Sequence, residues 1–345
     1  MTRTRYIITL TAQPPPRLLC ARRPAMLGLE TLFMRHALLA LLLPLAVTAA
    51  ARADTPLLED LSLRDGFRLS AVSTAERPLE LGTVLAGAPD AQPRWRLAQW
   101  GTRWNLLPAP ETVSADGART RRNEGKRVTV LPGGLAGEGV VLGVNGPAEY
   151  PDGPRKHGEP WPHLLVEQKI TREERLTAWS ALPFRVSFRV ERCDGPPPGQ
   201  ADPGLHTAHI TAFWTAHNGN PDSEGRGDML WFGVPLFDAR HPLPPGHQAE
   251  DGGQPLASHK FIYTVEGSRV QEGPVRIGEW RTISCDILPL LREALETAAT
   301  RGFMKDSRFG DLRLTSCNLG WEVPGSYDCE ITLKGLSLGA VPAVP

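Results

Sequence analysis

The sequence has no excess of either charge, because its 345 residues include 38 Lys and Arg and 38 Asp and Glu. This balance excludes a broad basic surface for nucleic acid and a long acidic tail. Only six of the 38 basic residues are lysine. The uncharged apolar run Ala37–Ala51 has fifteen residues, fewer than the roughly 20 that a membrane-spanning helix needs. We therefore expect no membrane span in the mature protein and no nucleic-acid partner.

Several motifs of nucleotide and metal chemistry are also missing. The chain has no Gly-x-Gly-x-x-Gly, no Gly-x-x-x-x-Gly-Lys and no Cys-x-x-Cys, which argues against dinucleotide, P-loop and zinc-ribbon sites. His206, His209 and His217 are close in sequence. On a strand, His209 and His217 share a face but lie about 26 Å apart, and His206 points the other way. We interpret all three as ordinary surface histidines and expect no metal and no cofactor.

The N-terminal region has the pattern of an export signal. Met34-Arg35-His36 supplies positive charge, the apolar run follows, and Ala51-Arg52-Ala53 forms a small-x-small cleavage site before Asp54. The sequence predicts a signal peptide over 34–53, an upstream extension over 1–33 that is not part of the native protein, and a single mature domain over 54–345. The protein is then secreted or periplasmic.

Removal of the N-terminal region leaves four of the five cysteines, at positions 193, 285, 317 and 329. An even count in an exported chain favours disulfides. We expect at least one bridge, between Cys317 and either Cys285 or Cys329.

Alternating apolar and polar residues dominate the remaining sequence. The clearest case is 183–193, where Phe184, Val186, Phe188 and Val190 alternate with polar residues. Further strands are expected at 127–131, 140–144, 164–170, 209–215, 229–237, 260–265, 311–323 and 329–338. The parity of the last strand slips at Gly335, as at a β-bulge. One helix is expected at about 287–301. Many strands and one late helix predict an all-β fold, an antiparallel β-sandwich without βαβ crossovers.

Tryptophans in polar surroundings point to a ligand class. The chain has nine tryptophans, and an indole face beside amides and carboxylates suits the apolar face and the hydroxyls of a sugar. We therefore expect a polysaccharide or oligosaccharide partner. The candidate substrate-binding residues are Trp231, Trp214, His217, Trp100, His163 and Trp161.

The C-terminal half resembles a known family. The single helix is followed by a strand that carries Gly320-Trp321-Glu322, then by a Pro-Gly turn and a closing strand. This order is similar to the end of the family-twelve glycoside hydrolases, endoglucanases with a concanavalin-A-like jelly roll. The resemblance implies that Glu322 is the acid/base. The family's nucleophile belongs to Glu-x-Met-x-Trp, where this chain has Met229 and Trp231 but Gly227 at the glutamate position, with Asp228 one residue away.

Glycoside hydrolysis needs two carboxyl groups, one to donate a proton and one to attack or to activate water. Glu322 beside Trp321 has the surroundings of a carboxyl with a raised pKa, and Asp228 or Glu167 is the candidate second carboxylate. We expect that second group within about 5–10 Å of Glu322, on a concave sheet face with Trp231 nearby. The leading hypothesis is a glycoside hydrolase acting on a β-linked polysaccharide.

Two alternatives remain open on the same fold. One is a non-catalytic, lectin-like carbohydrate-binding protein, which the missing nucleophile favours. The other is a polysaccharide lyase that uses Tyr150, Arg155, His157 and His163.

Overall fold

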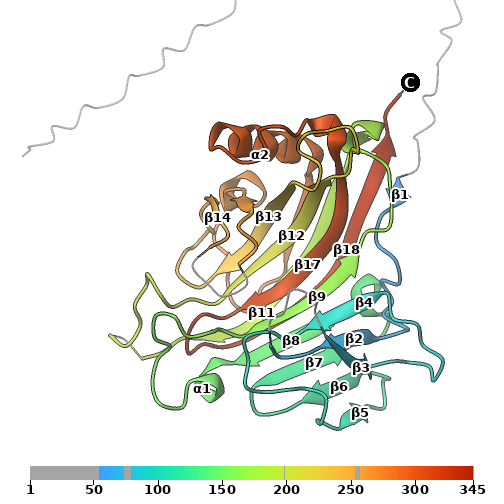
Figure 1. The fold of residues 1–345 in the computed structure, drawn as a ribbon. Helices are drawn as coiled ribbons and strands as arrows, with labels where there is room; N and C mark the ends of the chain where they lie inside the picture. Colours follow the sequence, from blue (N-terminus) through green and yellow to red (C-terminus); the bar gives the residue numbers. More distant parts are fainter. Residues whose placement is uncertain (1–53, 74–78, 198, 253–256, 345) are drawn as a thin grey trace, which may run out of the picture. The chain divides into compact units, whose positions relative to one another are not determined.

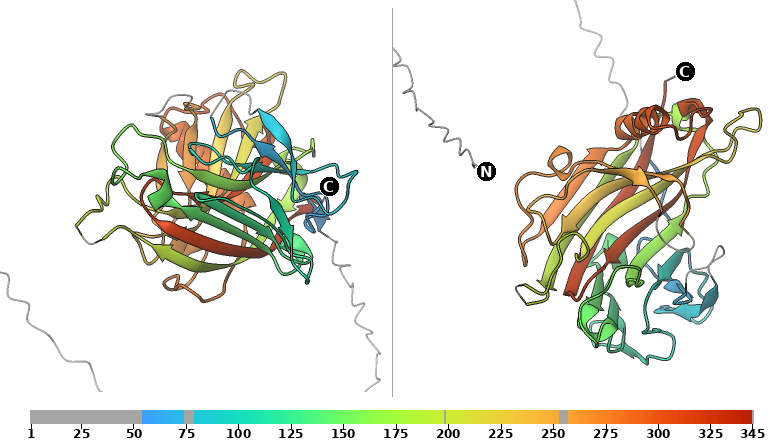
Figure 2. Two further views of the ribbon diagram at one scale, coloured as in Figure 1. Left: turned by 90° about the horizontal axis from the view of Figure 1, so that it is seen from below. Right: turned by 60° about the vertical axis from the view of Figure 1, so that its left-hand side comes forward.

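The computed structural model describes residues 54–73, 79–197, 199–252 and 257–344. These residues form two β-sheets, seen as two layers in Figure 2. The first sheet has the order β16-β11-β18-β8-β7-β6-β5, and β1 and β10 also pair with β18. The second sheet has the order β14-β15-β13-β12-β17-β9-β4-β2-β3. The predicted β-sandwich, the architecture of a jelly roll, is therefore confirmed.

The strands of the first sheet are β1 (Thr55–Pro56), β5 (Glu111–Val113), β6 (Arg119–Arg122), β7 (Lys126–Val130), β8 (Val140–Asn145), β10 (Trp179–Ala181), β11 (Pro183–Asp194), β16 (Arg281–Asp286) and β18 (Asp328–Pro342). The strands of the second sheet are β2 (Phe67–Ser70), β3 (Glu80–Val84), β4 (Trp95–Ala98), β9 (His163–Lys169), β12 (His209–Asn218), β13 (Met229–Asp238), β14 (His247–Glu250), β15 (Phe261–Thr264) and β17 (Leu312–Glu322). Every strand expected from sequence is present, with ends shifted by a few residues.

Period-two alternation explains which face of each strand is buried. On β11, Phe184, Val186, Phe188 and Val190 are at most 1 % exposed, because side chains at every second position point to the same face of a strand. The two inner faces meet in one hydrophobic cluster. Phe184 of the first sheet packs edge-on against Trp214 of the second, with ring centroids 4.7 Å apart.

The predicted bulge at Gly335 is present. Arg185 pairs with Ser337 and Ser187 with Lys334, so two residues of β18, Gly335 and its successor, lie opposite one residue of β11. Gly335 has φ +58°, a left-handed backbone conformation that glycine adopts without steric cost.

The predicted helix is confirmed as α2 (Leu288–Thr300). The Asp286 carboxylate accepts a hydrogen bond from the Leu288 amide at the start of this helix. Sequence analysis missed the short helix α1 (Gly146–Glu149). Its amide at Gly146 donates to Tyr327, just before β18 begins, whereas α2 contacts β10 near the other end of β18. The two helices therefore lie at opposite ends of the sandwich (Figure 1).

Short 3₁₀ helices occupy η1 (Gly134–Ala136), η2 (Leu176–Ala178), η3 (Gly267–Arg269) and η4 (Phe309–Asp311).

The sheets are not wholly antiparallel. Strands β13 and β15 pair in parallel, and so do β2 and β4. Each parallel pair is joined by chain that includes an intervening antiparallel strand, β14 or β3. The described residues of these connections form no helical crossover of the βαβ type.

The disulfide prediction was wrong for the described residues, where all four cysteines are free thiols. Cys317 is buried in the second sheet, while Cys285 lies on β16 of the first. The even count of cysteines therefore carried no information about pairing. Cys193 and Cys329 are directly opposite each other in the β11–β18 ladder, an arrangement that sequence spacing did not reveal.

The predicted signal peptide and upstream extension, residues 1–53, lie outside the described residues. No helix in the described part of the chain has the length and apolarity of a membrane span.

Candidate functional site

Glu322 lies between two histidines on three neighbouring strands. It ends β17, and the register places it opposite His209 of β12 on one side and His163 of β9 on the other. One Glu322 carboxylate oxygen is 3.3 Å from His163 Nε2 and 3.6 Å from His209 Nε2. We call these three residues the His–Glu–His row. Because each member is 21–26 % exposed, the row is accessible to a small polar group.

Strand parity sets the row on the outer face of the second sheet. Trp321, the preceding residue, is fully buried and donates its indole N–H to Leu142 O of the first sheet. Glu322 therefore points away from the core. Gly320 has φ +156°, and a Cβ there would lie 2.1 Å from Leu164 O. Glycine is thus required for the close approach of β17 to β9 that brings Glu322 to His163.

The row is an ion pair, and its charges oppose the predicted acid role of Glu322. Burial favours the neutral carboxyl, but hydrogen bonds and positive charge from His163 and His209 outweigh it and hold the pKa of Glu322 well below its usual range. Burial likewise disfavours the charged imidazole of His209, but its hydrogen bond to Glu322 and the carboxylate charge raise its pKa. A raised pKa was expected for Glu322. The opposite direction follows from the histidines, which only the tertiary structure brings into contact with it.

A further carboxylate extends the row by one strand. Asp238 of β13 is opposite His209. It is 6 % exposed, and Arg240 holds both of its oxygens, at 3.0 and 2.7 Å. Burial acts to raise the pKa of Asp238, but the Arg240 and Thr207 hydrogen bonds lower it to about 2. Because this carboxylate is already bound on both oxygens, it is not free to act as a nucleophile.

A large cavity borders the row. Its volume is about 1120 Å³, and most of its wall comes from residues 149–163. Tyr150, Arg155, His157 and His163, the four residues considered for a lyase, all line it, as does Trp161. His163 belongs both to the cavity wall and to the row, so a ligand in the cavity can reach the Glu322 ion pair through this imidazole.

The aromatic rings of the cavity wall contact each other. The Trp161 and His163 rings stack with centroids 5.8 Å apart, and the Trp100 ring, which does not itself line the cavity, is 6.1 Å from that of His163. The Arg155 guanidinium lies 5.1 Å from the Trp161 ring centroid. Gly101, with φ +64°, allows the chain to pass this wall, since a Cβ there would lie 2.1 Å from Trp161 O. These contacts, together with the close approach at Gly101, hold the Trp161 and His163 rings against the cavity wall.

A buried chain of hydrogen bonds supports the same wall. Lys126 donates to the Thr102 hydroxyl at 2.6 Å, and Thr102 donates to Glu149 at the end of α1. The Arg103 amide donates to the other Glu149 oxygen. Burial lowers the pKa of Lys126 to about 7, and the Glu149 charge opposes this shift. These contacts attach α1 to the loop at 102–103, so the start of the segment 149–163 is anchored.

The other predicted carboxylates do not join Glu322. The Asn218 amide donates to Asp228 O, and Asn218 is nine residues along β12 from His209, about 30 Å away. Glu167 is four residues along β9 from His163, about 13 Å, and pairs with Arg96 at 2.5 Å. Burial raises the pKa of Glu167, although Arg96 opposes this. The expectation of Asp228 within 10 Å of Glu322 was wrong, because strand register separates them by most of the length of β12. For Glu167, four residues along the β9–β17 ladder from Glu322, it stays a prediction.

Three further predicted binding residues also lie away from the row. Trp214 is 2 % exposed and belongs to the core between the sheets, so the prediction of a sugar contact is corrected. Trp231 is on the outer face opposite Thr215, about 20 Å along β12 from His209, and its indole N–H donates to Ser258. His217 is eight residues from His209, and burial and the Lys260 charge lower its pKa.

Sequence reasoning missed His209 and Asp238. His209 was interpreted as an ordinary surface histidine, but it is paired with Glu322. His206 is 4 % exposed and its Nε2 lies 2.7 Å from Arg155 O, so it is not a surface residue either. No signal in the sequence could have found these contacts, because they depend on which strands become neighbours and in what register.

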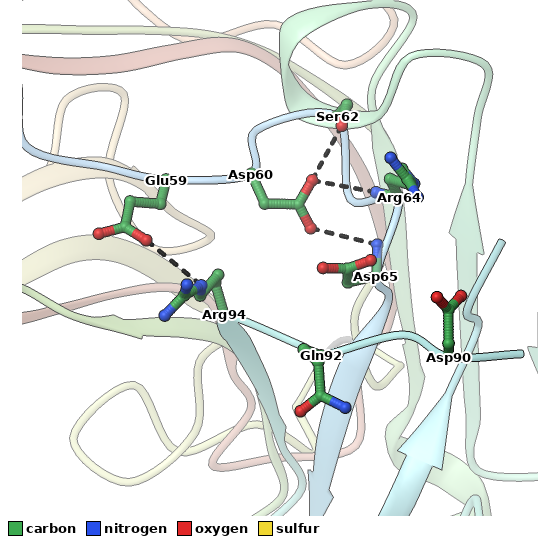
Figure 3. Close-up of a pocket in the computed structure, with 8 residues that line it drawn as sticks. All are labelled: Glu59, Asp60, Ser62, Arg64, Asp65, Asp90, Gln92 and Arg94. Atoms are coloured by element: carbon green, nitrogen blue, oxygen red, sulfur yellow. Dashed lines mark hydrogen bonds and ion pairs between the residues drawn. The ribbon is translucent and has the colours of Figure 1, made fainter. Parts of the chain in front are cut away.

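A second cavity, of about 460 Å³, lies between the loops before β2 and before β4 (Figure 3). Asp60 in its wall accepts hydrogen bonds from Ser62 and from the amides of Arg64 and Asp65. These bonds stabilise the turn itself. Within the described ranges, no group of three His, Cys, Asp or Glu side chains is placed to hold a metal ion.

The sequence also contains one Gly-x-Ser-x-Gly, at 335–339. It lies within strand β18, whereas the nucleophile elbow of hydrolases requires a strand, a sharp turn and a helix. Ser337 is therefore not a nucleophile of that kind.

Comparison with solved structures finds distant likenesses. A cellulase derived from Cel12A of Rhodothermus marinus shares 13 % identity, with a TM-score of 0.32 over 67 % of this chain and 95 % of that chain. The family 11 xylanase from Neocallimastix patriciarum shares 9 %, with a TM-score of 0.35 over 67 % and 95 %. Endoglucanase 3 of Trichoderma harzianum, from family GH12, shares 11 %, with a TM-score of 0.33 over 72 % and 98 %. No family model and no curated protein sequence matches the chain.

Proposed function

We propose that the protein binds a carbohydrate chain in the cavity walled by residues 149–163. The observation that carries this proposal is the cavity itself, whose volume of about 1120 Å³ exceeds the usual range of roughly 300–1,000 Å³ for small-molecule sites. It combines aromatic rings with hydrogen-bonding groups from Tyr150, Arg155 and His163. Such a lining suits an extended ligand with both apolar faces and many hydroxyls.

A polysaccharide panel tests the binding proposal. The purified protein is run in native gels that contain one polymer each, and we expect retardation by at least one of them. Trp161→Ala should abolish the retardation, because it removes the indole between Arg155 and His163. Trp280→Ala is the matched control, since that indole is 41 % exposed and stacks with Lys334 outside the cavity. Equal retardation of both variants would contradict the assignment of the cavity.

Cleavage of the bound glycan is a second candidate function, and the His–Glu–His row is the observation that favours it. His163 lies on the cavity wall with its Nε2 3.3 Å from the Glu322 carboxylate, and an imidazole oriented by a carboxylate is a suitable general acid toward a leaving glycosidic oxygen. His163 is then the acid and Glu322 orients it. Among the described residues, the candidate second carboxylate Glu167 and the neighbouring Asp238 are both bound by arginines, which argues against two-carboxylate hydrolysis by Glu322.

The cleavage candidate predicts a loss of turnover on change of His163. We expect His163→Gln to lower the rate of glycan cleavage by about 100-fold or more. His217→Gln should leave this rate unchanged, because His217 lies about 26 Å along β12 from His209. New reducing ends without ultraviolet absorbance identify hydrolysis, and an absorbing unsaturated sugar identifies elimination. If a polymer is bound but gives neither product, the cleavage candidate is contradicted and the protein binds carbohydrate without cleaving it.

Export belongs to the same proposal, since residues 34–53 have the pattern of an export signal. Mass analysis of the protein from its native host should find a chain that begins at Asp54. Recovery of an intact N-terminus would contradict export by this signal.

A further inference from the structure

Two hydrogen-bond donors in the cavity wall have no acceptor. Among the described residues, neither Arg155 Nε nor Trp161 Nε1 has a partner, and both atoms are buried. The guanidinium lies over the indole at 5.1 Å, so the two donors are close together. The remaining Arg155 side-chain hydrogen bonds go to the backbone carbonyls of Lys156, Glu159 and Leu205, at 3.4, 2.8 and 3.1 Å. A ligand with hydrogen-bond acceptor atoms would therefore satisfy both donors.

The charges of the cavity wall point the same way. Arg155 is 6 % exposed, yet no carboxylate in the described ranges forms an ion pair with it or with Lys156. The nearby acidic side chains are engaged internally: Glu159 accepts from the Lys156 amide, and Glu149 from Thr102 and from a backbone amide. Asp152 is exposed. Among the described residues, the buried Arg155 guanidinium thus has no carboxylate partner, and it carries one of the two unpaired donors.

A buried guanidinium without an anionic partner is costly, because carbonyl dipoles replace only part of its hydration. Arginine is the residue that best recognises a planar carboxylate, through two parallel N–H···O bonds. A ligand carboxylate at this point would supply both the missing charge and the missing acceptors. A hydroxyl of a neutral sugar supplies an acceptor but no charge.

We propose that the cavity takes an acidic glycan, with the carboxylate of a uronic acid unit bound by Arg155 and the Trp161 N–H. This inference rests on the proposed carbohydrate binding and names its substrate class. It also distinguishes this protein from a binder of neutral β-glucan, because a neutral glucan has no anionic group to pair with the buried Arg155.

Four polymers test the substrate class by affinity electrophoresis: polygalacturonate, the same polymer with its carboxyl groups reduced to alcohols, a neutral β-glucan, and dextran sulfate as a sulfated polyanion. We expect binding to polygalacturonate, and a dissociation constant at least about tenfold weaker after carboxyl reduction, as for loss of a charged hydrogen bond. Equal binding of the reduced polymer or of the neutral glucan would overturn the inference but leave carbohydrate binding intact. Equal or stronger binding of dextran sulfate would also overturn it, by showing general attraction of anions. Failure to bind any of the four would overturn the inference, and failure across the whole polysaccharide panel would remove the proposed carbohydrate binding as well.

Two variants locate the carboxylate. Arg155→Gln should weaken polygalacturonate binding by about tenfold or more and leave any residual binding of the reduced polymer unchanged. Arg68→Gln is the control, since Arg68 Nε also lacks a hydrogen bond, but the Arg68 side chain on β2 pairs with Glu80 on the neighbouring edge strand β3. Because Arg155 also crosslinks two loops, Trp161→Phe is the second variant, which keeps an aromatic ring, though a smaller one, and removes the N–H donor. Unchanged binding of the acidic polymer by both folded variants would overturn the inference.

Discussion

Glu322 and His209 shift each other's pKa in opposite directions, and this gives the folded state a characteristic pH dependence. The lowered pKa of Glu322 contributes stability above the unfolded value of about 4.3, and that contribution is lost as the pH falls. The raised pKa of His209 contributes stability that is complete below about 6.5 and is lost as the pH rises through the folded value. Both contributions are present together only between about pH 4.5 and 6.5.

The corresponding variant is Glu322→Gln. We expect the difference in unfolding free energy between wild type and variant to be largest between about pH 4.5 and 6.5, and to shrink toward pH 9 and toward pH 3. Urea unfolding at several pH values measures it. Glu250→Gln is the control, because its pair with His259 is exposed and weak. A difference as large at pH 9 as at pH 5.5 would show that the ion pair does not form.

At the level of elements, the site depends on the contact between β17 and β9. Gly320→Ala places a Cβ 2.1 Å from Leu164 O, so the two strands must separate and Glu322 must move from His163. We expect a destabilisation of about 3–5 kcal/mol, measured by urea unfolding. Gly82→Ala has a similar φ of +144° but no atom within 4 Å of the added Cβ. Its cost should be only about 1–2 kcal/mol, and equal costs would show that backbone strain, not strand contact, requires the glycine.

At the level of the whole molecule, one apolar cluster joins the two sheets over the described residues. Trp321 is fully buried in it and bonds to Leu142 O across the sandwich. Trp321→Ala should therefore lower the stability of both sheets together, by about 3–5 kcal/mol, in a single transition. Trp280→Ala, on the surface, should cost less than about 1 kcal/mol. Separate melting of the sheets, followed by calorimetry, would contradict a shared core.

Much of the fold was readable from local pattern. Period-two alternation located nine strands, the helical spacing located α2, and the slip in parity located the bulge at Gly335. These features depend on interactions between residues near in sequence, and burial of one face then selects the strand or helix. The position of Glu322 on an outer face followed from the same parity, because its neighbour Trp321 had to be inside. His163, Trp161 and the residues considered for a lyase also do line one cavity.

The tertiary structure alone decided the chemistry of the site. Whether Glu322 meets Asp228 or His209 depends on strand order and register, which are set by packing between segments more than 100 residues apart. A carboxyl beside two imidazoles is ionised, whereas the same carboxyl beside an indole alone would tend to keep its proton. The cysteines followed the same rule, since Cys193 and Cys329 became neighbours only through the β11–β18 ladder. Local sequence specifies whether a side chain points into the core or to the outer face of its sheet. The free energy of ionising that side chain depends on the groups that other strands place next to it.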